Sequence, residues 1–443
     1  MSAPLRVLHL VQNLNYGGME RLIHELARLA DPARLEVHVM ALQYVGRFGQ
    51  GLEGVAPVHL AGRMEPWSLL RPAVLAQRIR RIGPRVVHTH SGVWLKGARA
   101  ARMAGVPRVV HTEHGRRHPD PPADRWLDGR AARWTDVVCA VSRPLAAQLE
   151  ARVVRGRASV AVVRNGVDTE VFHPRADDGR ARAALGIAPG APVLGSIGRL
   201  EPVKGYDVAV RALALLLAGW SDGPAPVLLV AGDGSERARL AALARALGIA
   251  DHVLLPGWRD DLAALHPCFS LFTLSSHSEG TSVSLLEAMS AGLCPVVTDA
   301  GGNADVLGPA LRHRLVPRND PAALARAWRD ALRDIAARRA DGRAARERVT
   351  ARFSAHVMAL RYEAVYRGAP LSDDDAGAAW RAEPIDPTGS ADSVDSTDSM
   401  DSTDSVDSVD STDSTDSTDR VDAVEDGRVA LRSSEGGGAE GWG

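Results

Sequence analysis

The chain has 443 residues, which is enough for two domains and a sizeable core. Its hydrophobic fraction of 45% and charged fraction of 24% are typical of a soluble globular protein. No apolar run approaches the roughly 20 residues of a membrane span, and Arg6 interrupts the short apolar stretch near the N-terminus. The sequence therefore predicts neither a transmembrane helix nor a secretory signal peptide.

Three cysteines, Cys139, Cys268 and Cys294, lie far apart in the sequence, each in an apolar context. This pattern favours buried thiols in a reducing compartment over a disulfide framework. We therefore expect a cytoplasmic protein.

The net charge of −1 conceals a strong asymmetry. Residues 371–443 hold 16 Asp, 4 Glu and 4 Arg, a charge of −16, which leaves +15 for residues 1–370. A basic body suits phosphate-bearing ligands, and it also suits a peripheral contact with an anionic membrane. No basic run is interleaved with aromatic residues as single-strand binders require, so we expect no nucleic-acid partner.

The chain opens with a strand, a glycine turn and a helix. Leu5–Val11 is an apolar run of strand length, Gly17 and Gly18 break the chain, and Met19–Leu29 has apolar residues at helical spacing. This order is typical of a doubly wound domain, in which ligands bind at the carboxyl ends of the strands.

Further strand-like runs alternate with helix-like segments rich in Ala and Arg. The alternation predicts a mostly parallel sheet covered on both faces. The runs are Val37–Leu42, Val86–His90, Val109–Thr112, Val137–Val141 and Val160–Val163. We place the first domain at residues 1–172, followed by an interdomain connection at 173–191 that is rich in Pro, Asp, Arg and Gly.

A second array of strands and helices occupies residues 192–352. Its predicted strands are Pro192–Ile197, Val227–Val230, Val253–Leu255, Leu271–Leu274 and Cys294–Thr298. Residues 322–352 are predicted to be helical, and a last helix follows at about 353–368. The fold class is therefore α/β with two doubly wound, Rossmann-like domains.

The character of the chain changes at Leu371. Residues 371–443 are acidic, and Ser390–Asp419 is a nearly perfect triplet repeat of Asp, Ser and Thr or Val. With almost no large apolar side chains, this segment cannot offset the entropy cost of ordering. We expect a disordered C-terminal tail.

The stretch from Ser275 to Asn303 carries the strongest chemical pattern. Glu279 and Glu287 stand eight residues apart, and Gly280, Thr281 and Ser282 suit a loop that enters a helix. The N-terminus of such a helix offers unpaired amides and a positive dipole to an anion, with one acid beside it and another about two turns deeper. The alternative is an ordinary helix whose two glutamates face solvent.

A second candidate for anion binding lies at the start of the second domain. Gly198-Arg199-Leu200 follows a predicted strand, and Lys204-Gly205 comes shortly after it. Arg199 and Lys204 would supply cations to a phosphate. Only Lys96 and Lys204 among the 53 basic residues are lysine, which hints at a need for a compact ammonium at these places. The alternative is a solvated loop of mixed charge.

Taken in order, these motifs resemble those of retaining glycosyltransferases of family 4, which have the GT-B fold. The matching elements are the Gly17-Gly18 turn, Arg199 with Lys204, the Glu-x7-Glu pair at 279 and 287, and the Asn-Gly-Val-Asp segment at 165–168. The resemblance covers about residues 5–367. It implies two Rossmann-like domains facing across a cleft, with the last helix crossing back onto the first domain.

The resemblance also implies roles for individual residues. Glu279 would reach the transferred sugar, the amides of Gly280, Thr281 and Ser282 would hold the diphosphate, and Glu287 would bind the ribose hydroxyls. Gly17 and Gly18 would let backbone approach the donor phosphates or the acceptor. His114 resembles the active-site histidine of the family, and His111 would take this place if the register of the match were shifted along the strand. The loop that begins at Gly257 would flank the nucleotide base.

The sequence favours a site without a metal ion. The part expected to fold has no Asp-x-Asp motif beside an apolar strand, whereas Arg199, Lys204 and helix amides could neutralise phosphates themselves. We expect no cofactor besides the nucleotide sugar, which is a co-substrate. A zinc constellation built from His88, His90, His111 and His114 is a less favoured alternative.

The resemblance implies an enzyme that moves a hexose from a nucleoside diphosphate to a glycan or lipid-linked acceptor in exopolysaccharide or cell-envelope glycan synthesis. It would act in the cytoplasm, including the inner face of the membrane. Two alternatives stay open. One is a sugar-nucleotide epimerase of the same fold, and the other is a non-catalytic sugar-nucleotide-binding subunit. Donor hydrolysis by the purified protein would exclude the second.

Overall fold

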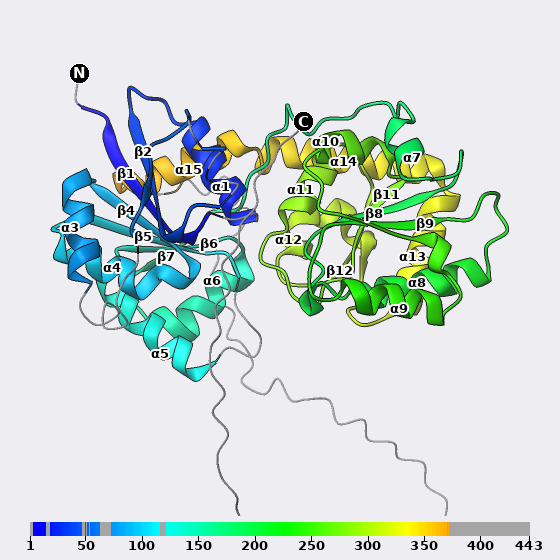
Figure 1. Cartoon of the computed structure of the whole chain (residues 1–443), viewed down its shortest axis with the longest axis horizontal. Helices are drawn as coiled ribbons and strands as arrows, with labels where there is room; N and C mark the ends of the chain where they lie inside the picture. The colour runs from blue at the N-terminus through cyan, green and yellow to red at the C-terminus, as the bar shows by residue number, and fades with distance from the viewer. Residues whose placement is uncertain are drawn as a thin grey trace, which may run out of the picture. The chain divides into compact units, whose positions relative to one another are not determined.

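Two parallel β-sheets, each with helices beside it, form the framework of the chain (Figure 1). The computed structural model describes residues 3–14, 18–46, 49, 51–52, 54–62, 72–115, 121–369 and 371. Gly17 and the predicted disordered tail at 372–443 lie outside these residues. The two sheets confirm the predicted α/β class.

In the first half, the described strands form a seven-stranded sheet in the order β3-β2-β1-β4-β5-β6-β7. The strands are β1 (Leu5–Asn13), β2 (Leu35–Tyr44), β3 (Val58–Leu60), β4 (Val86–His90), β5 (Arg108–Glu113), β6 (Val137–Ala140) and β7 (Ser159–Val162). The helices are α1 (Gly18–Arg28), α3 (Ala73–Ile82), α4 (Trp94–Met103), α5 (Pro122–Ala131) and α6 (Arg143–Leu149).

The second half holds a six-stranded sheet in the order β10-β9-β8-β11-β12-β13. Its strands are β8 (Val193–Ile197), β9 (Val227–Ala231), β10 (Val253–Gly257), β11 (Leu271–Leu274), β12 (Pro295–Thr298) and β13 (Leu315–Val316). The helices are α7 (Arg180–Ala184), α8 (Tyr206–Ala218), α9 (Arg237–Ala246), α10 (Leu262–Leu265), α11 (Val283–Ser290), α12 (Asn303–Leu307), α13 (Pro321–Arg333), α14 (Ile335–Arg352) and α15 (Ala355–Arg367). No helix of the described residues is both long and apolar enough to span a bilayer.

The predicted strands all form, and most of them are apolar runs buried on both faces of a parallel sheet, whereas the edge strands β7 and β10 are only partly buried. Two edge strands, β3 and β13, escape prediction. They have three and two residues, too few to show a periodic pattern. The predicted helical stretch at 322–352 divides into α13 and α14 at Asp334, whose side chain accepts a hydrogen bond from the Ala337 amide at 2.8 Å and caps α14.

The segment at 173–191 is more structured than a simple connection. It contains α7, and Ile187 and Ala191 are buried in the core of the second half. Arg182 ties the segment down by donating to the carbonyl oxygens of Ala191 and Cys268, each at 2.8 Å. All three cysteines are buried free thiols, as the sequence predicts.

The strand order reverses between β1 and β4 in the first sheet and between β8 and β11 in the second. In open parallel sheets, ligands bind beyond the carboxyl ends of the strands at such a switch point. The segments that follow these strand ends contain Gly18, His114, Arg199, Lys204 and Glu279. The fold thus gathers residues from distant parts of the sequence at two strand-end edges.

The last helix, α15, packs on the first half of the chain, beside α1 and β5 (Figure 1). Its Met358 and Tyr362 belong to the same buried cluster as Val7 of β1. The Tyr362 hydroxyl shares a hydrogen bond of 3.1 Å with Thr112 Oγ1, and Arg108 of β5 donates to a carbonyl oxygen of α15. The C-terminal end of the described chain therefore closes the core of the N-terminal half.

We expect Tyr362→Ala to lower the free energy of unfolding by about 3–5 kcal/mol, the usual loss when a large buried aromatic residue is truncated. Leu360→Ala is the matched control on the same helix, because Leu360 is 48% exposed, and it should change stability by no more than about 0.5 kcal/mol. Urea unfolding followed by circular dichroism measures both. Equal effects of the two substitutions would contradict the packing role of α15.

Candidate active site

A cavity of about 480 Å³ lies between the strand ends of the two halves, which belong to one compact unit of residues 1–382. From the first half it is lined by Gly18, Met19, Glu20, Arg21, Ser91, His114 and Asn165. From the second half it is lined by Ile197, Gly198, Arg199, Lys204, Ala231, Gly232, Trp258, Arg259, Leu262, Glu279, Thr281, Ser282, Val283, Ser284 and Glu287. We call this cavity the cleft.

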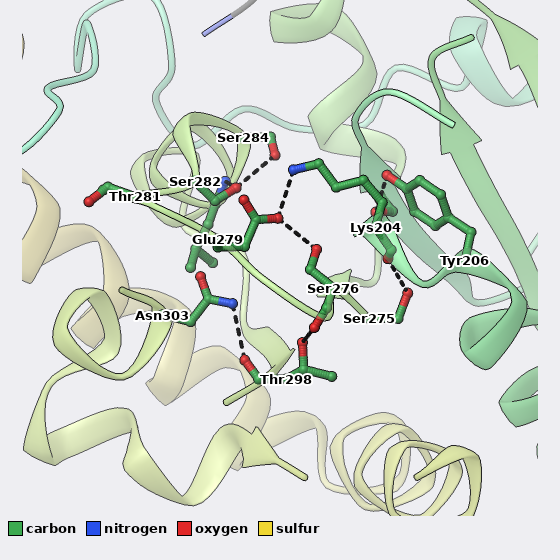
Figure 2. Close-up of polar contacts among 12 residues, drawn as sticks. Lys204, Tyr206, Ser275, Ser276, Glu279, Thr281, Ser282, Ser284, Thr298 and Asn303 are labelled. Carbon is green, nitrogen blue, oxygen red and sulfur yellow. Dashed lines mark hydrogen bonds and ion pairs between the residues drawn. The ribbon is translucent and has the colours of Figure 1, made fainter. Parts of the chain in front are cut away.

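Glu279 lies in the loop between β11 and α11, with a cation and a hydroxyl fixed on one of its oxygens. Its Oε1 accepts a hydrogen bond from Lys204 Nζ at 2.7 Å and another from Ser276 Oγ at 2.6 Å (Figure 2). Both charged side chains are largely buried. A buried carboxylate is costly unless a cation and hydrogen bonds accompany it, and here both are present.

The backbone around Lys204 explains its position. Lys204 ends a short 3-10 helix, and Gly205 follows with φ +58, a left-handed conformation that favours glycine. A Cβ on Gly205 would lie only 2.3 Å from the carbonyl oxygen of Ser275. The Ser275 hydroxyl donates to the carbonyl oxygen of Lys204 at 3.1 Å (Figure 2), so the two strand-end loops are tied together.

The N-terminus of α11 faces the cleft. Ser282 caps the helix, and its hydroxyl accepts a hydrogen bond from the Leu285 amide at 3.4 Å. Thr281 is anchored to the first half, because its hydroxyl donates to the carbonyl oxygen of Val141 at 2.5 Å. Asn165 Nδ2 donates to the carbonyl oxygen of Thr281 at 2.9 Å from the same side. The start of α11 is therefore fixed at the lining of the cleft. A helix N-terminus in such a place offers unpaired amides and a positive dipole to an anion.

Three glycines let backbone segments meet beside Glu279. A Cβ on Gly280 would lie 2.2 Å from the carbonyl oxygen of His114, and one on Gly302 would lie 2.1 Å from that of Gly280. Gly301 has φ +55, and its Cβ would lie 1.7 Å from the carbonyl oxygen of Glu279. The Gly301-Gly302 turn therefore serves as a close-packed support of the Glu279 loop.

Glu287 is 2% exposed and lies on α11 opposite Arg21 of α1. Arg21 Nη1 donates to Glu287 Oε1, while Oε2 has no hydrogen-bond partner among the described residues. Burial raises the pKa of the Glu287 carboxyl, and the Arg21 charge opposes this shift. Glu287 is therefore a buried acid with one oxygen bonded to Arg21 and one buried oxygen that lacks a hydrogen-bond partner among the described residues.

Sequence reasoning did not single out Arg21. Arginine makes up all but two of the 53 basic residues, so composition offers no reason to choose this one. Its position after Gly18 and Glu20, in the motif that follows the first strand, is the signal that could have found it. Ser276 was missed as well, because a lone serine in a loop carries no pattern.

His114 lines the cleft directly after β5. Its Nε2 lies 3.0 Å from Nδ1 of His90, and burial lowers the pKa of His114 to about 4. His114 is therefore a neutral imidazole at physiological pH. The fallback residue, His111, stacks on Trp94 with 3.9 Å between ring centroids and is not part of the cleft lining.

Some of the remaining predicted residues line the cleft and others do not. Arg199 is exposed and lines the cleft together with Lys204, and Gly18 lines it where an added Cβ would lie 3.2 Å from the Val283 side chain. Gly257 ends β10 with φ +85 and does not itself line the cleft, although the next two residues, Trp258 and Arg259, do. Gly17 lies outside the described residues.

The alternative zinc constellation is not assembled as predicted, because neither His111 nor His114 belongs to a group of three or more described side chains spaced closely enough to share a metal ion. His9, His88 and His90 instead bring ring nitrogens within 4.8 Å of one another. Both nitrogens of His88 are already hydrogen-bonded, to Tyr366 at 2.8 Å and to Thr112 at 2.7 Å. Both nitrogens of His90 bond to neighbouring histidines. This group is a hydrogen-bonded part of the core.

The chain matches two family models that together span most of the described structure. Residues 16–171 match Glycosyltransferase Family 4, and residues 177–348 match Glycosyl transferases group 1. In structure, the chain is similar to Anabaena HepE in complex with UDP-glucose, with a TM-score of 0.73, 21% identity and coverage of 82% of this chain and 100% of that one. The shared architecture is GT-B, as the sequence predicts.

Two of the relatives that are similar in sequence illustrate the match. The D-inositol 3-phosphate glycosyltransferase of Corynebacterium urealyticum is 31% identical over 55% of this chain, which spans only 61% of that protein's length. The 2-deoxystreptamine glucosyltransferase of Streptomyces kanamyceticus is 30% identical over 69% of this chain and 81% of its own. On these matches, together with the fold, the chain belongs to glycosyltransferase family 4.

Proposed function

We propose that the protein is a retaining glycosyltransferase that moves a hexosyl group from a nucleoside diphosphate to a hydroxyl of a glycan or lipid-linked acceptor. The observation that carries the proposal is the convergence of Lys204, Arg199, Glu279, Glu287 and His114 on one cleft. Its volume of about 480 Å³ lies in the range of small-molecule sites. Retention of anomeric configuration is what membership of the family implies.

The leaving diphosphate would lie at the N-terminus of α11. Arg199 and Lys204 line the cleft together with Thr281 and Ser282 at the start of α11, and the amides of Gly280, Thr281 and Ser282 would complete the phosphate site. One opposite charge at about 4 Å is worth roughly 4 kcal/mol at an effective dielectric of 20. Donors fixed in advance by the fold stabilise charge as it develops on the leaving group, because they need not reorganise during the reaction.

The ribose would lie at Glu287. The unpartnered Oε2 is ready to accept from a ribose hydroxyl, and the second hydroxyl would compete with Arg21 for Oε1. Arg21 would then be released toward the phosphates. Such an exchange keeps the buried carboxylate hydrogen-bonded both with and without the nucleotide.

The transferred sugar would lie between Glu279 and His114. Glu279 Oε1 is occupied by Lys204 and Ser276, which leaves Oε2 for a sugar hydroxyl. A second hollow, of about 640 Å³, shares four lining residues with the cleft: His114, Arg199, Lys204 and Glu279. An acceptor would approach through this hollow.

We further propose that the protein works in the cytoplasm and at the inner face of the membrane, in exopolysaccharide or envelope glycan synthesis. The basic charge of residues 1–370 supports attraction to anionic lipid and to phosphate-bearing substrates. The named relatives act on an inositol phosphate and on 2-deoxystreptamine. Soluble cyclitols therefore belong among the acceptors to be tested beside lipid-linked glycans.

The test begins with thermal-shift measurements on a panel of UDP-, GDP- and ADP-sugars, with UDP-glucose first because the structural neighbour HepE binds it. Mass analysis of reactions with envelope lipid extracts and with cyclitols follows. We expect a product heavier by one hexosyl residue. Conversion of the nucleotide sugar to its epimer would instead support an epimerase, and binding without hydrolysis or transfer would support a non-catalytic subunit.

Arg199→Ala and Lys204→Ala should each reduce kcat by about 10²–10³, the scale seen when one fixed donor to developing charge is removed. Arg211→Ala on α8 is the matched control, because Arg211 is exposed and outside the cleft. It should turn over the donor normally. Normal turnover in all three variants would exclude the phosphate role of Arg199 and Lys204.

Glu279→Gln and Glu287→Gln should fail differently. Glu279 would contact the sugar as positive charge develops on the ring, so its loss should lower kcat and kcat/KM together. Glu287 would hold ribose hydroxyls that do not change in the reaction, so its loss should mainly raise the donor KM, by about 1.5–3 kcal/mol in binding free energy. Steady-state kinetics with varied donor separates the two, and the opposite pattern would mean that the roles are reversed.

Turnover should persist in EDTA, because Arg199, Lys204 and the α11 amides supply the positive charge that a divalent ion would otherwise provide. The measurement is donor hydrolysis and transfer before and after dialysis against chelator. Loss of activity that Mg²⁺ or Mn²⁺ restores would show that the site requires a metal ion.

A further inference from the structure

Three imidazoles form a hydrogen-bonded chain that runs from the cleft into the core of the first half. His114 Nε2 lies 3.0 Å from His90 Nδ1, and His90 Nε2 lies 3.0 Å from His9 Nδ1. His9 is on β1, His90 ends β4, and His114 follows β5, so the row of hydrogen-bonded histidines crosses three neighbouring strands. The ring planes of each bonded pair are nearly parallel, with interplanar angles of 13° and 26°.

All three rings are neutral at physiological pH. Burial lowers the pKa of His9 to about 3 and that of His114 to about 4, and burial together with the neighbouring histidines lowers the pKa of His90 well below its ordinary value. A neutral imidazole has one N–H and one lone pair. In a chain of such rings every N–H must therefore point the same way, and only two arrangements exist.

The two arrangements differ at the buried end of the row of histidines, at His9. His9 Nε2 is fully buried and has no hydrogen-bond partner in the described part of the chain. In one arrangement this nitrogen carries an N–H without an acceptor, and in the other it keeps only a lone pair. Buried donors that lack an acceptor are rarer in proteins than acceptors that lack a donor. This favours the arrangement in which the proton of His9 is on Nδ1.

In that arrangement His9 Nδ1–H donates to His90 Nε2, and His90 Nδ1–H donates to His114 Nε2. We propose that His9 and His90 are positioning residues that hold His114 as its Nδ1–H tautomer, so that His114 presents a hydrogen-bond donor, not a base, to the cleft. The effect of this tautomer on turnover rests on the function proposed above. The assignment of the tautomer itself does not rest on that function. A donor at this place would bind an oxygen of the transferred sugar or of the acceptor.

His88 provides a matched control within the same cluster. It is as buried as His9 and pairs with it across β1 and β4. Its ring nitrogens bond to Tyr366 and Thr112, so it stands outside the chain of three. A general disturbance of the core should follow from substitution of either residue, whereas a change of the His114 tautomer should follow only from substitution of His9.

The direct test is a long-range ¹H–¹⁵N correlation spectrum of the full chain labelled with ¹⁵N-histidine, which separates protonated from unprotonated ring nitrogens. His9→Asn and His114→Asn assign the signals. We expect His9, His90 and His114 to carry their protons on Nδ1 and to stay neutral from about pH 6 to 9. A His114 that is protonated on Nε2, or that titrates in this range, would overturn the proposal.

The kinetic test compares His9→Leu, His9→Asn and His88→Leu. Leucine removes the Nδ1 donor, so the His114 tautomer should become mixed and kcat should fall about 3- to 10-fold, the scale of one neutral hydrogen bond, with the donor KM unchanged. Asparagine can place an amide N–H where Nδ1–H was and should restore both the tautomer and kcat. His88→Leu should leave the tautomer unchanged.

Two results would contradict the proposal: an unchanged His114 tautomer in His9→Leu, or no rescue by asparagine. If His9→Leu does not fold, the spectrum of the wild-type chain and the kinetics of His9→Asn still decide. If the protein turns over no nucleotide sugar at all, the proposed function fails. The spectra still show which ring nitrogen of His114 carries the proton, and so they still test the proposal.

Discussion

A buried carboxylate is tolerated in a protein only where a cation and hydrogen bonds accompany it, and the cleft depends on this constraint twice. Glu279 is held by Lys204, which lies 75 residues earlier in the chain, and Glu287 is held by Arg21, which lies 266 residues earlier. Each acid therefore requires a partner from another loop or another sheet. The cleft lining is held together because the fold delivers those partners.

Close backbone approach is the second constraint. The Glu279 loop packs against the carbonyl oxygen of His114 at Gly280 and against the Gly301-Gly302 turn, at separations that leave no room for a side chain. Thr281 and Asn165 add hydrogen bonds between the same segments. The acid is thus placed by main chain on several sides. Main chain is a more rigid support than side chains, because it has fewer rotatable bonds to fix.

The return of α15 to the first half has a consequence beyond packing. The face of the first sheet beneath α15 is unusually polar for a core, with His9, His88 and Thr112 buried on it. The hydroxyls of Tyr362 and Tyr366 cover this face and bond to Thr112 and His88. The last helix of the described chain thereby satisfies His88 and Thr112, whereas His9 Nε2 has no hydrogen-bond partner among the described residues. The histidine chain that ends at His114 lies in this sealed layer.

Sequence alone determined the α/β class, most of the strands and some of the residues that line the cleft, namely Arg199, Lys204, Glu279 and Glu287, because parallel strands and helix starts leave local patterns. Family resemblance added the two-domain GT-B architecture. The short edge strands β3 and β13 could not be predicted, since two or three residues carry no period. Neither could the partners of the buried acids. A hydrogen bond between Arg21 and Glu287, or between His9 and His90, joins residues whose proximity depends on strand order and on the packing of the two halves, which no local pattern records. Tertiary structure alone decided which arginine meets Glu287 and which histidines align behind His114.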